Sequence, residues 1–526
     1  MKKLLFLSII LLMCASLVLG CNTPTTTPAK PTTPTPASKT PAATTQAPTP
    51  KYGGTFRYID PRSPATSIGW VAESMPPAGM YACLMIEGLN YVDRQGLPKP
   101  RLATEWSVAP DLKSMTFTLR KSVKFHDGSD FNGAVAKWNI DQYIAAKVSG
   151  VKNFSSVDLI DDYTIRINLK QYSNTLFGNV ASIGMVSKDA FDKVGKEGLR
   201  WNPVGTGPFK FVSYQRDVVL KCARFDNYWK GRPYLDAIEA QFIIDPLTAS
   251  ASFEAGEADA VGGDVVKVLY DLQQKKYEIL KHYSGVITLI PDSKNSDSIF
   301  ANPKVRQAID YAIDRDAIVK ARGFGLWTTT YQFCAPGASA YITDLPARTY
   351  NPEKAKQLLA EAGYPTGFKT KIIGDSSTTD KEATVAVQGF FSKVGIDAQL
   401  DWVDYASFLK YVMGGWQNAI LACANGVGAN QNQYIDTVWS QNAAFFPSVL
   451  KTGQMQALIN ESMGAKDYNP ALVQKVLRYM HDEAMFIPLY CITRGHAVQP
   501  YVRDTGFYTL GSPANSWQPG ETWLSK

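Results

Sequence analysis

The stretch KIIGDSSTTDKEATVAVQGFFSKVGIDAQLDW, residues 371–402, decides the fold class. It opens with a β-like run at Lys371–Ile373 and continues into a helix predicted over Glu382–Val394, which Gly395 ends. From residue 396 to residue 402, apolar side chains recur at every second position, the period of a half-buried strand. A strand, a helix and a strand in succession form a βαβ unit. This region is therefore predicted to be an α/β domain with a parallel or mixed sheet.

Two predicted helices upstream of this unit carry clear start signals. Asn302-Pro303 and Asn351-Pro352 each supply an N-cap residue followed by proline at the first helical position. Gly363 ends the second helix. The first helix has apolar residues at helical spacing, and we expect three charged residues to lie off that apolar stripe, namely Arg306, Asp310 and Arg315.

The N-terminal third of the chain has a different pattern. Met115, Phe117 and Leu119 alternate with threonines, and Tyr163–Leu169 is a second alternating run. Both patterns predict strands of a β-rich α+β region. Two different patterns in one chain indicate lobes that are joined by crossing segments.

Residues 1–20 have the layout of an export signal. Lys2 and Lys3 precede an uncharged, mostly apolar run over Leu4–Gly20, and Cys21 follows it. This arrangement resembles the lipobox of bacterial lipoproteins, in which the cysteine after the cut carries lipid. Lipidation of Cys21 would anchor the exported chain to the outer face of the cytoplasmic membrane, in the periplasm or at the cell surface. An ordinary secretory signal and, less favoured, a single membrane-spanning anchor are the alternatives.

The segment that follows Cys21 reads as a tether. Residues 22–50 contain eleven Thr and eight Pro, with no aromatic and no acidic residue. Such a segment cannot bury enough apolar surface to offset its ordering entropy, so residues 21–50 are predicted to be disordered.

Size, charge and cysteine count limit the class of protein. Residues 51–526 are too many for one core, so two or three domains are expected. The formal net charge of +7 falls to +3 for these residues, because four lysines precede residue 51, and a nucleic-acid binder is not indicated. We expect a monomeric body with buried free thiols at five cysteines, namely Cys83, Cys222, Cys334, Cys423 and Cys491.

A search for catalytic and metal motifs favours binding over catalysis. The four histidines are not paired at metal-ligand spacing, and neither a Cys-x-x-Cys motif nor a Walker phosphate loop occurs. A Gly-x-Ser-x-Gly nucleophile elbow is also lacking. The sequence therefore predicts no catalytic residue, no metal and no cofactor.

Several motifs together resemble the family 5 extracytoplasmic solute-binding proteins, which serve peptide-type and nickel-type ABC importers. The similarity begins at Gly53–Arg57 and includes the signature region that opens with Pro100–Trp106. It continues through the Gly-Thr-Gly-Pro turn at Gly205–Pro208 and the hallmark segment Val305–Arg315. These motifs occur in the family's order over more than 400 residues.

This resemblance implies a mixed α/β, two-lobed clamshell of the type II periplasmic-binding-protein kind. One lobe would take residues 51–86, 190–290 and 498–526. A β-rich insert would take residues 87–189, and the α/β lobe residues 291–497. The ligand would sit in a cleft between the lobes. The resemblance also makes His126 a turn residue rather than a metal ligand.

The resemblance places ligand specificity in the segment 422–432. Peptide-binding members have a carboxylate there that holds the ligand's amino terminus. This chain has no Asp or Glu in the segment, and Asn425 stands nearest to that position, which puts an ordinary peptide ligand in doubt. The candidate ligand-binding residues are Asn425, Gly426, Trp416, Trp327, Trp70 and Tyr81, and each of the rings is equally well explained as core.

The predicted function is capture of a small organic or oligopeptide-like solute by lobe closure, and its delivery to an ABC permease with ATPase subunits. A ligand-sensing receptor of the same fold, feeding a chemoreceptor or kinase, is the alternative. A surface hydrolase is less favoured, because no nucleophile and base are recognisable in the sequence.

Overall fold

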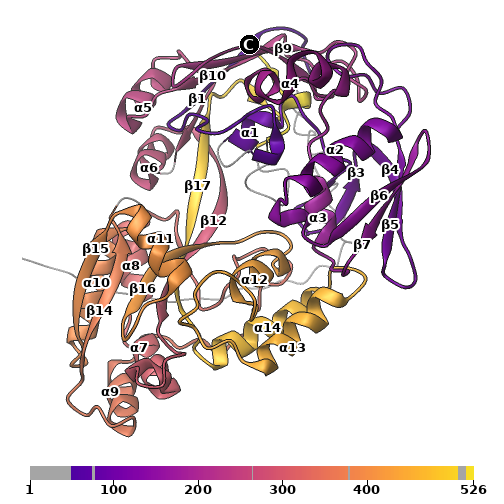
Figure 1. The fold of residues 1–526 in the computed structure, drawn as a ribbon. Coiled ribbons are helices and arrows are strands. Elements are labelled where there is room, and N and C mark those ends of the chain that lie inside the picture. The colour runs from indigo at the N-terminus through magenta and orange to yellow at the C-terminus, as the bar shows by residue number, and fades with distance from the viewer. Residues whose placement is uncertain (1–48, 74–77, 264, 377–378, 508–516) are drawn as a thin grey trace, which may run out of the picture. The chain divides into compact units, whose positions relative to one another are not determined.

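The computed structural model describes residues 49–526 apart from 74–77, 264, 377–378 and 508–516. The predicted signal, Cys21 and nearly all of the predicted tether lie outside the described residues. Residues Thr49–Lys526 form one compact unit. Its described strands form sheets of eleven, four, two and two strands (Figure 1).

The eleven-stranded sheet runs through most of this unit. Its order is β15 (Asp397–Val403), β14 (Lys369–Asp375), β16 (Ile420–Gly426), β12 (Glu278–Pro291), β17 (Ile487–Val498), β11 (Ala260–Gly263), β1 (Thr55–Asp60), β10 (Ala237–Phe242), β9 (Val219–Arg224) and β8 (Phe209–Gln215), and β13 (Thr328–Thr329) also pairs with β17.

The long strands β12 and β17 join two groups of parallel strands. They pair antiparallel from Glu278 opposite Val498 to Leu289 opposite Ile487, and Figure 1 shows them side by side. On one side β1 is parallel to β10 and β11, and on the other β14 is parallel to β15 and β16. The predicted lobe boundaries near residues 290 and 497 fall at the ends of these two strands, although the boundaries themselves stay predictions.

Helices cover both faces of the β14–β16 group. One buried cluster joins its strands to α7 (Pro303–Tyr311), α8 (Arg315–Arg322), α9 (Pro352–Glu361) and α10 (Lys381–Ser392). A second cluster joins the same strands to α11 (Tyr405–Gly414), α12 (Asn432–Trp439), α13 (Gly453–Gly464) and α14 (Pro470–Asp482). Ile372 and Ile420 belong to the first cluster and their neighbours Ile373 and Leu421 to the second, as the alternation of side chains along a strand requires.

The predicted βαβ unit and both helix starts are confirmed. β14, α10 and β15 follow one another, and the two strands are parallel. The side chains of Asn302 and Asn351 accept bonds from the amides of Lys304 and Lys354, each ahead of a proline in the first turn.

Arg306, Asp310 and Arg315 are expected only to lie off the apolar stripe, and the structure adds that their side chains are themselves buried. Arg315 is the first residue of α8 rather than part of α7. Arg306, Asp310 and Arg315 are each at most 3% exposed. Arg306 donates to the carbonyls of Glu483, Ala484 and Phe300. Arg315 pairs with Asp310 and donates to the carbonyl of Pro488 at 2.7 Å.

The β-rich region is a separate four-stranded antiparallel sheet. Its order is β4 (Ala103–Val108), β5 (Ser114–Leu119), β7 (Thr164–Leu169) and β6 (Phe154–Asp161). A buried cluster joins it to α2 (Gly133–Ala145) and α3 (Leu176–Ala181). The short pair β2 (Asn90–Val92) and β3 (Pro98–Pro100) precedes it, and the two strands predicted in this region are confirmed.

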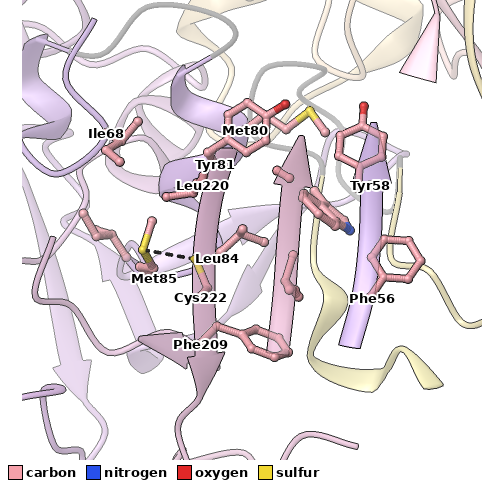
Figure 2. Close-up of a cluster of buried hydrophobic side chains, with 14 of the residues drawn as sticks. Phe56, Tyr58, Ile68, Met80, Tyr81, Leu84, Met85, Phe209, Leu220 and Cys222 are labelled. Atoms are coloured by element: carbon pink, nitrogen blue, oxygen red, sulfur yellow. Dashed lines mark hydrogen bonds between the residues drawn. The ribbon is translucent and has the colours of Figure 1, made fainter. Parts of the chain in front are cut away.

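The sheet around β1 has its own core. One face packs on α1 (Ala78–Ala82) and α4 (Lys188–Trp201), and Figure 2 shows Phe56 and Tyr58 of β1 in this cluster, with the Cys222 thiol 3.8 Å from the Met85 sulfur. The other face packs on α5 (Pro246–Glu254) and α6 (Val266–Gln274). The remaining elements are β18 (Val502–Arg503), β19 (Trp523–Leu524) and the 3₁₀ turns Val71–Glu73, Ser149–Val151, Ile299–Ala301 and Pro519–Glu521.

The five cysteines of the described residues are free thiols, as expected from the sequence, but only Cys222, Cys334 and Cys491 are buried, whereas Cys83 and Cys423 are half-buried. Among helices of the described part of the chain, none combines the length and the apolar character that crossing a bilayer requires.

Candidate functional site

The two groups of parallel strands run in opposite directions and end at the same place. β11 ends at Gly263 opposite Gly495 of β17, which in turn lies opposite Lys281 of β12. β16 ends at Gly426 opposite Gly285 of β12. The carboxyl ends of both groups therefore meet at the middle of β12 and β17. Ligands of open α/β sheets bind at the carboxyl ends of the strands, so this meeting point is the candidate site.

The floor of the site is the middle of β12 and β17. His282 and Arg494 lie opposite each other there, and both are half-buried. The pairing register shifts between Tyr283 and Gly285, which marks a bulge. Bulges bend a strand and commonly occur beside functional sites. The strand that carries His282 is therefore bent at the point where the two groups of strands meet.

One wall of the site is the carboxyl end of β1. Asp60, its last residue, is fully buried. Its Oδ2 accepts hydrogen bonds from the hydroxyls of Tyr81 at 2.7 Å and Tyr58 at 3.2 Å. Its Oδ1 accepts from the backbone amide of Arg62 at 2.9 Å and from the Arg62 Nε at 3.2 Å. The carboxylate of Asp60 thus fixes the position of the Arg62 Nε.

Hydrogen bonds and ring contacts connect this wall to the floor. The Tyr58 hydroxyl lies 2.9 Å from Nε2 of His496. The His496 ring stacks on Phe507, with 3.9 Å between ring centroids and 5° between planes. His496 is two residues from Arg494 on β17, so the two side chains point to the same face of the sheet.

The opposite wall is the carboxyl end of β16. Asn425 is 5% exposed, and its Nδ2 donates to Oγ1 of Thr288 at 2.7 Å. The Thr288 hydroxyl donates to the carbonyl of Cys423 at 3.1 Å. At Gly426 an added Cβ would lie 2.3 Å from the Tyr434 ring. Glycine at this position therefore allows Tyr434 to pack against the strand.

The electrostatic environment of the floor is positive. Burial first, and then the charges of Arg494, Arg94 and Arg62, lower the pKa of His282 to about 3. Burial likewise lowers the pKa of His496, with smaller contributions from His282 and Arg62. Both imidazoles are therefore neutral at physiological pH, and the positive charge of the floor comes from the guanidiniums.

Two hollows adjoin the site. A pocket of about 950 Å³ lies between residues 428–434 and the elements α1 and α3, and it is lined by Cys83, Ile86, Tyr91, Phe177, Asn430 and Tyr434, among others. A larger hollow of about 3250 Å³, open to solvent, is lined by the β2–β3 turn, the start of β12 and the segment after β17. Arg94 and Leu280 belong to the second hollow.

The six residues proposed from the sequence do not lie together. Asn425 and Gly426 are at the site, and the buried Tyr81 reaches it through Asp60. Trp416 and Trp70 are 4% and 7% exposed and belong to separate buried clusters. The Trp416 Nε1 donates to the carbonyl of Ala419 at 3.1 Å. Trp327 stacks on Tyr490, with 4.6 Å between ring centroids. These contacts explain the three tryptophans as packing residues.

Sequence reasoning did not single out Arg62, His282 or Arg494 as residues of this site. A signal was present, because β12 and β17 are otherwise rich in apolar residues and a charged side chain in the middle of such a strand calls for an explanation. Among the described residues, no group of three His, Cys, Asp or Glu side chains is placed to hold a metal ion.

Comparison with known proteins gives consistent results. The family model for bacterial extracellular solute-binding proteins, family 5 Middle, matches residues 98–446. The heme-binding protein A of Haemophilus influenzae is 29% identical over 473 residues, which cover 78% of this chain and 85% of that protein. The glutathione-binding protein GsiB of Escherichia coli O1:K1 is 32% identical over 340 residues, 63% of this chain and 66% of that protein.

Among solved structures, HbpA2 from Haemophilus parasuis is similar, with a TM-score of 0.80 and 22% sequence identity. The alignment covers 90% of this chain and all (100%) of that one. At this identity the likeness shows the fold. It is the mixed α/β fold of periplasmic binding proteins, with an additional antiparallel sheet.

Proposed function

Because the chain belongs to family 5 of the bacterial extracellular solute-binding proteins, we propose that it captures a small organic solute at the middle of β12 and β17 and delivers it unaltered to an ABC importer. The family consists of extracytoplasmic binding proteins rather than enzymes. The observation that carries the proposal is the meeting of the carboxyl ends of both strand groups at one place.

We propose that the solute is an organic molecule whose binding does not require a protein carboxylate to hold a free amino terminus. The relatives named above bind heme and glutathione, and the glutathione-binding relative is matched over 66% of its length. Asn425 stands nearest to the position where the family resemblance implies an acidic residue in peptide binders, and the segment 422–432 contains no Asp or Glu. An amide accepts a hydrogen bond but does not neutralise an ammonium, and a buried unpaired charge costs several kcal/mol.

Capture is proposed to proceed by closure of the two strand groups about β12 and β17. Solute that contacts both walls stabilises the closed form, and closure follows from that difference in affinity. The closed chain then docks on a permease. ATP hydrolysis belongs to partner subunits, since no ATP-binding motif occurs in this sequence.

The chain is further proposed to be anchored outside the cytoplasmic membrane through lipid on Cys21, with residues 22–50 as a tether. Mass spectrometry of the mature N-terminus tests this, because a lipidated Cys21 adds the mass of its acyl groups. An unmodified cysteine or a cleavage site elsewhere contradicts the anchoring.

The function is tested by incubating the purified full-length chain with the small-molecule fraction of yeast extract. After gel filtration the chain is denatured, and the released solutes are identified by mass spectrometry. At least one solute should be retained and released chemically unaltered. Small-angle scattering should show a smaller radius of gyration with that solute than without it.

A pair of glycine variants locates the binding. At Gly262 an added Cβ would lie 2.3 Å from the Tyr58 hydroxyl, whereas Gly389, on α10, has nothing within 4 Å of the added atom. Gly262→Ala should weaken solute binding by about tenfold or more, and Gly389→Ala should leave it unchanged. Equal binding by both variants, or no retained solute at all, contradicts the proposal.

A further inference from the structure

The pocket of about 950 Å³ beyond the carboxyl end of β16 is formed by three parts of the chain. α1 and the residues after it contribute Ala82 and Cys83, the segment from β2 to α3 contributes Tyr91 and Phe177, and residues 428–434 complete the lining. None of the described residues that line it belongs to β12 or β17. The volume lies in the range of pockets that hold small organic molecules.

Tyr434 connects this pocket to the candidate site. Its ring packs against Gly426, the last residue of β16, where an added Cβ would lie 2.3 Å from the ring. Asn425 precedes Gly426 in the strand, and Gly428 already lines the pocket. A solute bound at the wall formed by Asn425 can therefore extend into the pocket.

The lining from α1, β2 and α3 supplies apolar side chains, namely those of Ile86, Val92 and Phe177. Gly178 follows Phe177 in α3. Among the described residues, the one atom within 4 Å of a Cβ added at Gly178 is the Gln433 Oε1, at 3.7 Å, so alanine would fit there. Glycine destabilises a helix relative to alanine. Its presence in α3 is explained if a ligand occupies the space beside it.

The lining from residues 430–434 supplies uncharged hydrogen-bonding groups. The Oδ1 of Asn430 accepts from the backbone amide of Asn432 at 3.1 Å. The Nδ2 of Asn430, the side-chain amide of Gln433 and the hydroxyl of Tyr434 bond to no other described residue. These three groups are available to a ligand.

The pocket has no uncompensated charge among its described lining residues. Arg101 is the one charged side chain there, and it pairs with the carboxylate of Glu87 at 3.8 Å. Its guanidinium also lies 5.4 Å from the centroid of the Tyr91 ring. A charged group of a ligand would lose hydration in this pocket without gaining an opposite charge. The lining therefore favours an uncharged ligand group.

Buried asparagines hold the walls of the pocket together. The Oδ1 of Asn174, which lines the pocket, accepts from the Nδ2 of Asn432 at 3.2 Å, and the Oδ1 of Asn432 accepts from the Ser462 hydroxyl at 2.9 Å. Both asparagines are at most 3% exposed. The pocket is therefore preformed, and little free energy is needed to order its walls when a ligand binds.

We infer that this pocket holds an uncharged, ring-bearing part of the solute, which packs on Phe177 and forms hydrogen bonds with Asn430 and Gln433. A ring is favoured because three aromatic side chains, those of Tyr91, Phe177 and Tyr434, line the pocket, and aromatic rings gain from packing on one another. This inference rests on the proposed function and specifies the class of its solute.

Fluorescence titration of the full-length chain with N-phenylnaphthylamine tests the pocket directly. This probe is an uncharged molecule of linked aromatic rings with one N–H group. Anilinonaphthalene sulfonate has the same rings and a negative charge, and it serves as the matched probe. The uncharged probe should bind about tenfold or more tightly than the sulfonate, because the sulfonate finds no opposite charge in the pocket.

Two variants fill the pocket from different elements. Gly178→Phe places a ring on α3, and Gln433→Phe places one on α12. Each should weaken binding of the uncharged probe by about tenfold or more, because the new ring overlaps with the ligand. Gly389→Phe is the matched control, since Gly389 is a helical glycine of α10 with nothing within 4 Å of an added Cβ. Gln433 is exposed, so Gln433→Phe keeps the test valid even where Gly178→Phe melts early.

The same variants, incubated with the small-molecule fraction of yeast extract, separate the two proposals. Retained solutes that carry an uncharged ring, and that both pocket variants but not Gly389→Phe retain more weakly, support both proposals. Three results overturn this inference and leave solute capture standing: retained solutes without a ring, binding of probe or solute that either folded pocket variant leaves unchanged, and a sulfonate that binds as tightly as the uncharged probe. Failure to retain any solute overturns the proposed function and this inference with it.

Discussion

At the scale of single residues, the buried carboxylate of Glu87 shows why several motif residues occur together. Glu87 is 4% exposed, and it accepts hydrogen bonds from the Thr206 hydroxyl, the Tyr228 hydroxyl and the Trp229 Nε1 at 2.8–2.9 Å. Arg101 pairs with it at 3.8 Å. Arg101 and Thr206 lie within two separate motifs of the family resemblance, and their common partner Glu87 becomes visible only in three dimensions.

Glu87→Gln is expected to destabilise the chain by about 2–4 kcal/mol, because it weakens charge-assisted hydrogen bonds and leaves Arg101 without its buried partner. Urea denaturation measures the change in the free energy of unfolding. Glu197→Gln is the control, since Glu197 is 76% exposed and pairs with Arg200 on the surface. A shift no larger than that of the control would contradict the role of Glu87.

His126 has a structural role in a turn. Its Nε2 donates to the carbonyl of Gly207 at 2.9 Å, and its Nδ1 accepts from the amide of Gly205, which fixes a neutral tautomer. Both glycines are required, because a Cβ at Gly205 would lie 2.2 Å from the Met85 carbonyl and one at Gly207 would lie 2.7 Å from that of Leu84. The turn-residue role that the family resemblance implied for His126 agrees with these contacts.

His126 should make the folded chain sensitive to acid. Burial lowers its pKa to about 4, so between this value and about 6.5 the unfolded chain binds a proton that the folded chain does not. The contribution of neutral His126 to the free energy of unfolding is complete above pH 6.5. It falls by up to about 3 kcal/mol as the pH falls toward 4.

Urea denaturation at pH 7 and pH 5 checks this, with His126→Gln as the comparison. His282, His481 and His496 also have lowered pKa values, so the wild-type chain keeps some pH dependence from them in either case. The difference in stability between wild type and variant should shrink at pH 5. A difference that does not depend on pH would contradict the argument.

At the scale of elements, the sequence predicted helices and strands well where the signal was local. Asn302 and Asn351 identify helix starts because an N-cap acts on the amides of the next turn. The burial of Arg306 could not be predicted in the same way. Its acceptors include the carbonyls of Glu483 and Ala484, which lie almost 180 residues away in the chain.

Contacts between elements also connect the β-rich sheet region to α12 and α13. Asn174, just ahead of α3, donates from its backbone to the carbonyl of Met463 at 2.9 Å and from its side chain to that of Ser462 at 2.8 Å. Asn432 donates to Oδ1 of Asn174 at 3.2 Å and is fully buried. These bonds hold the end of α13 beside α3.

Asn174→Ala should therefore release the end of α13. Hydrogen exchange of the amides near residues 462–466 should become faster, while exchange in β14 and β16 stays unchanged, because the lost bonds are local. Ser182→Ala is a suitable control, since its hydroxyl bonds only within its own helix, to the carbonyl of Gly178 at 2.9 Å. Unchanged exchange near residue 463 would contradict this role of Asn174.

At the scale of the whole molecule, the fold class followed from local patterns, but the site did not. Whether Arg494 meets His282 depends on the register of two strands about 210 residues apart, including a bulge that shifts it. No periodicity in the sequence encodes that register. The family resemblance supplied the position of Asn425, which lies inside β16, one residue before its end. The tryptophans were chosen by residue type alone: Trp70 and Trp416 are buried, and Trp327 is half-buried against Tyr490.

The five free thiols, three buried and two half-buried, have a practical consequence for optical measurements on this protein. Burial raises the pKa of Cys83 to about 11 and those of Cys222, Cys334, Cys423 and Cys491 to about 12, so maleimide dyes should react with them slowly. Leu247, on α5, and Val385, on α10, are 71% and 52% exposed. Cysteines introduced at these two positions should therefore react with the dye before the native cysteines do. Energy transfer between dyes at these two positions would make the doubly substituted chain a fluorescent reporter of its own solute.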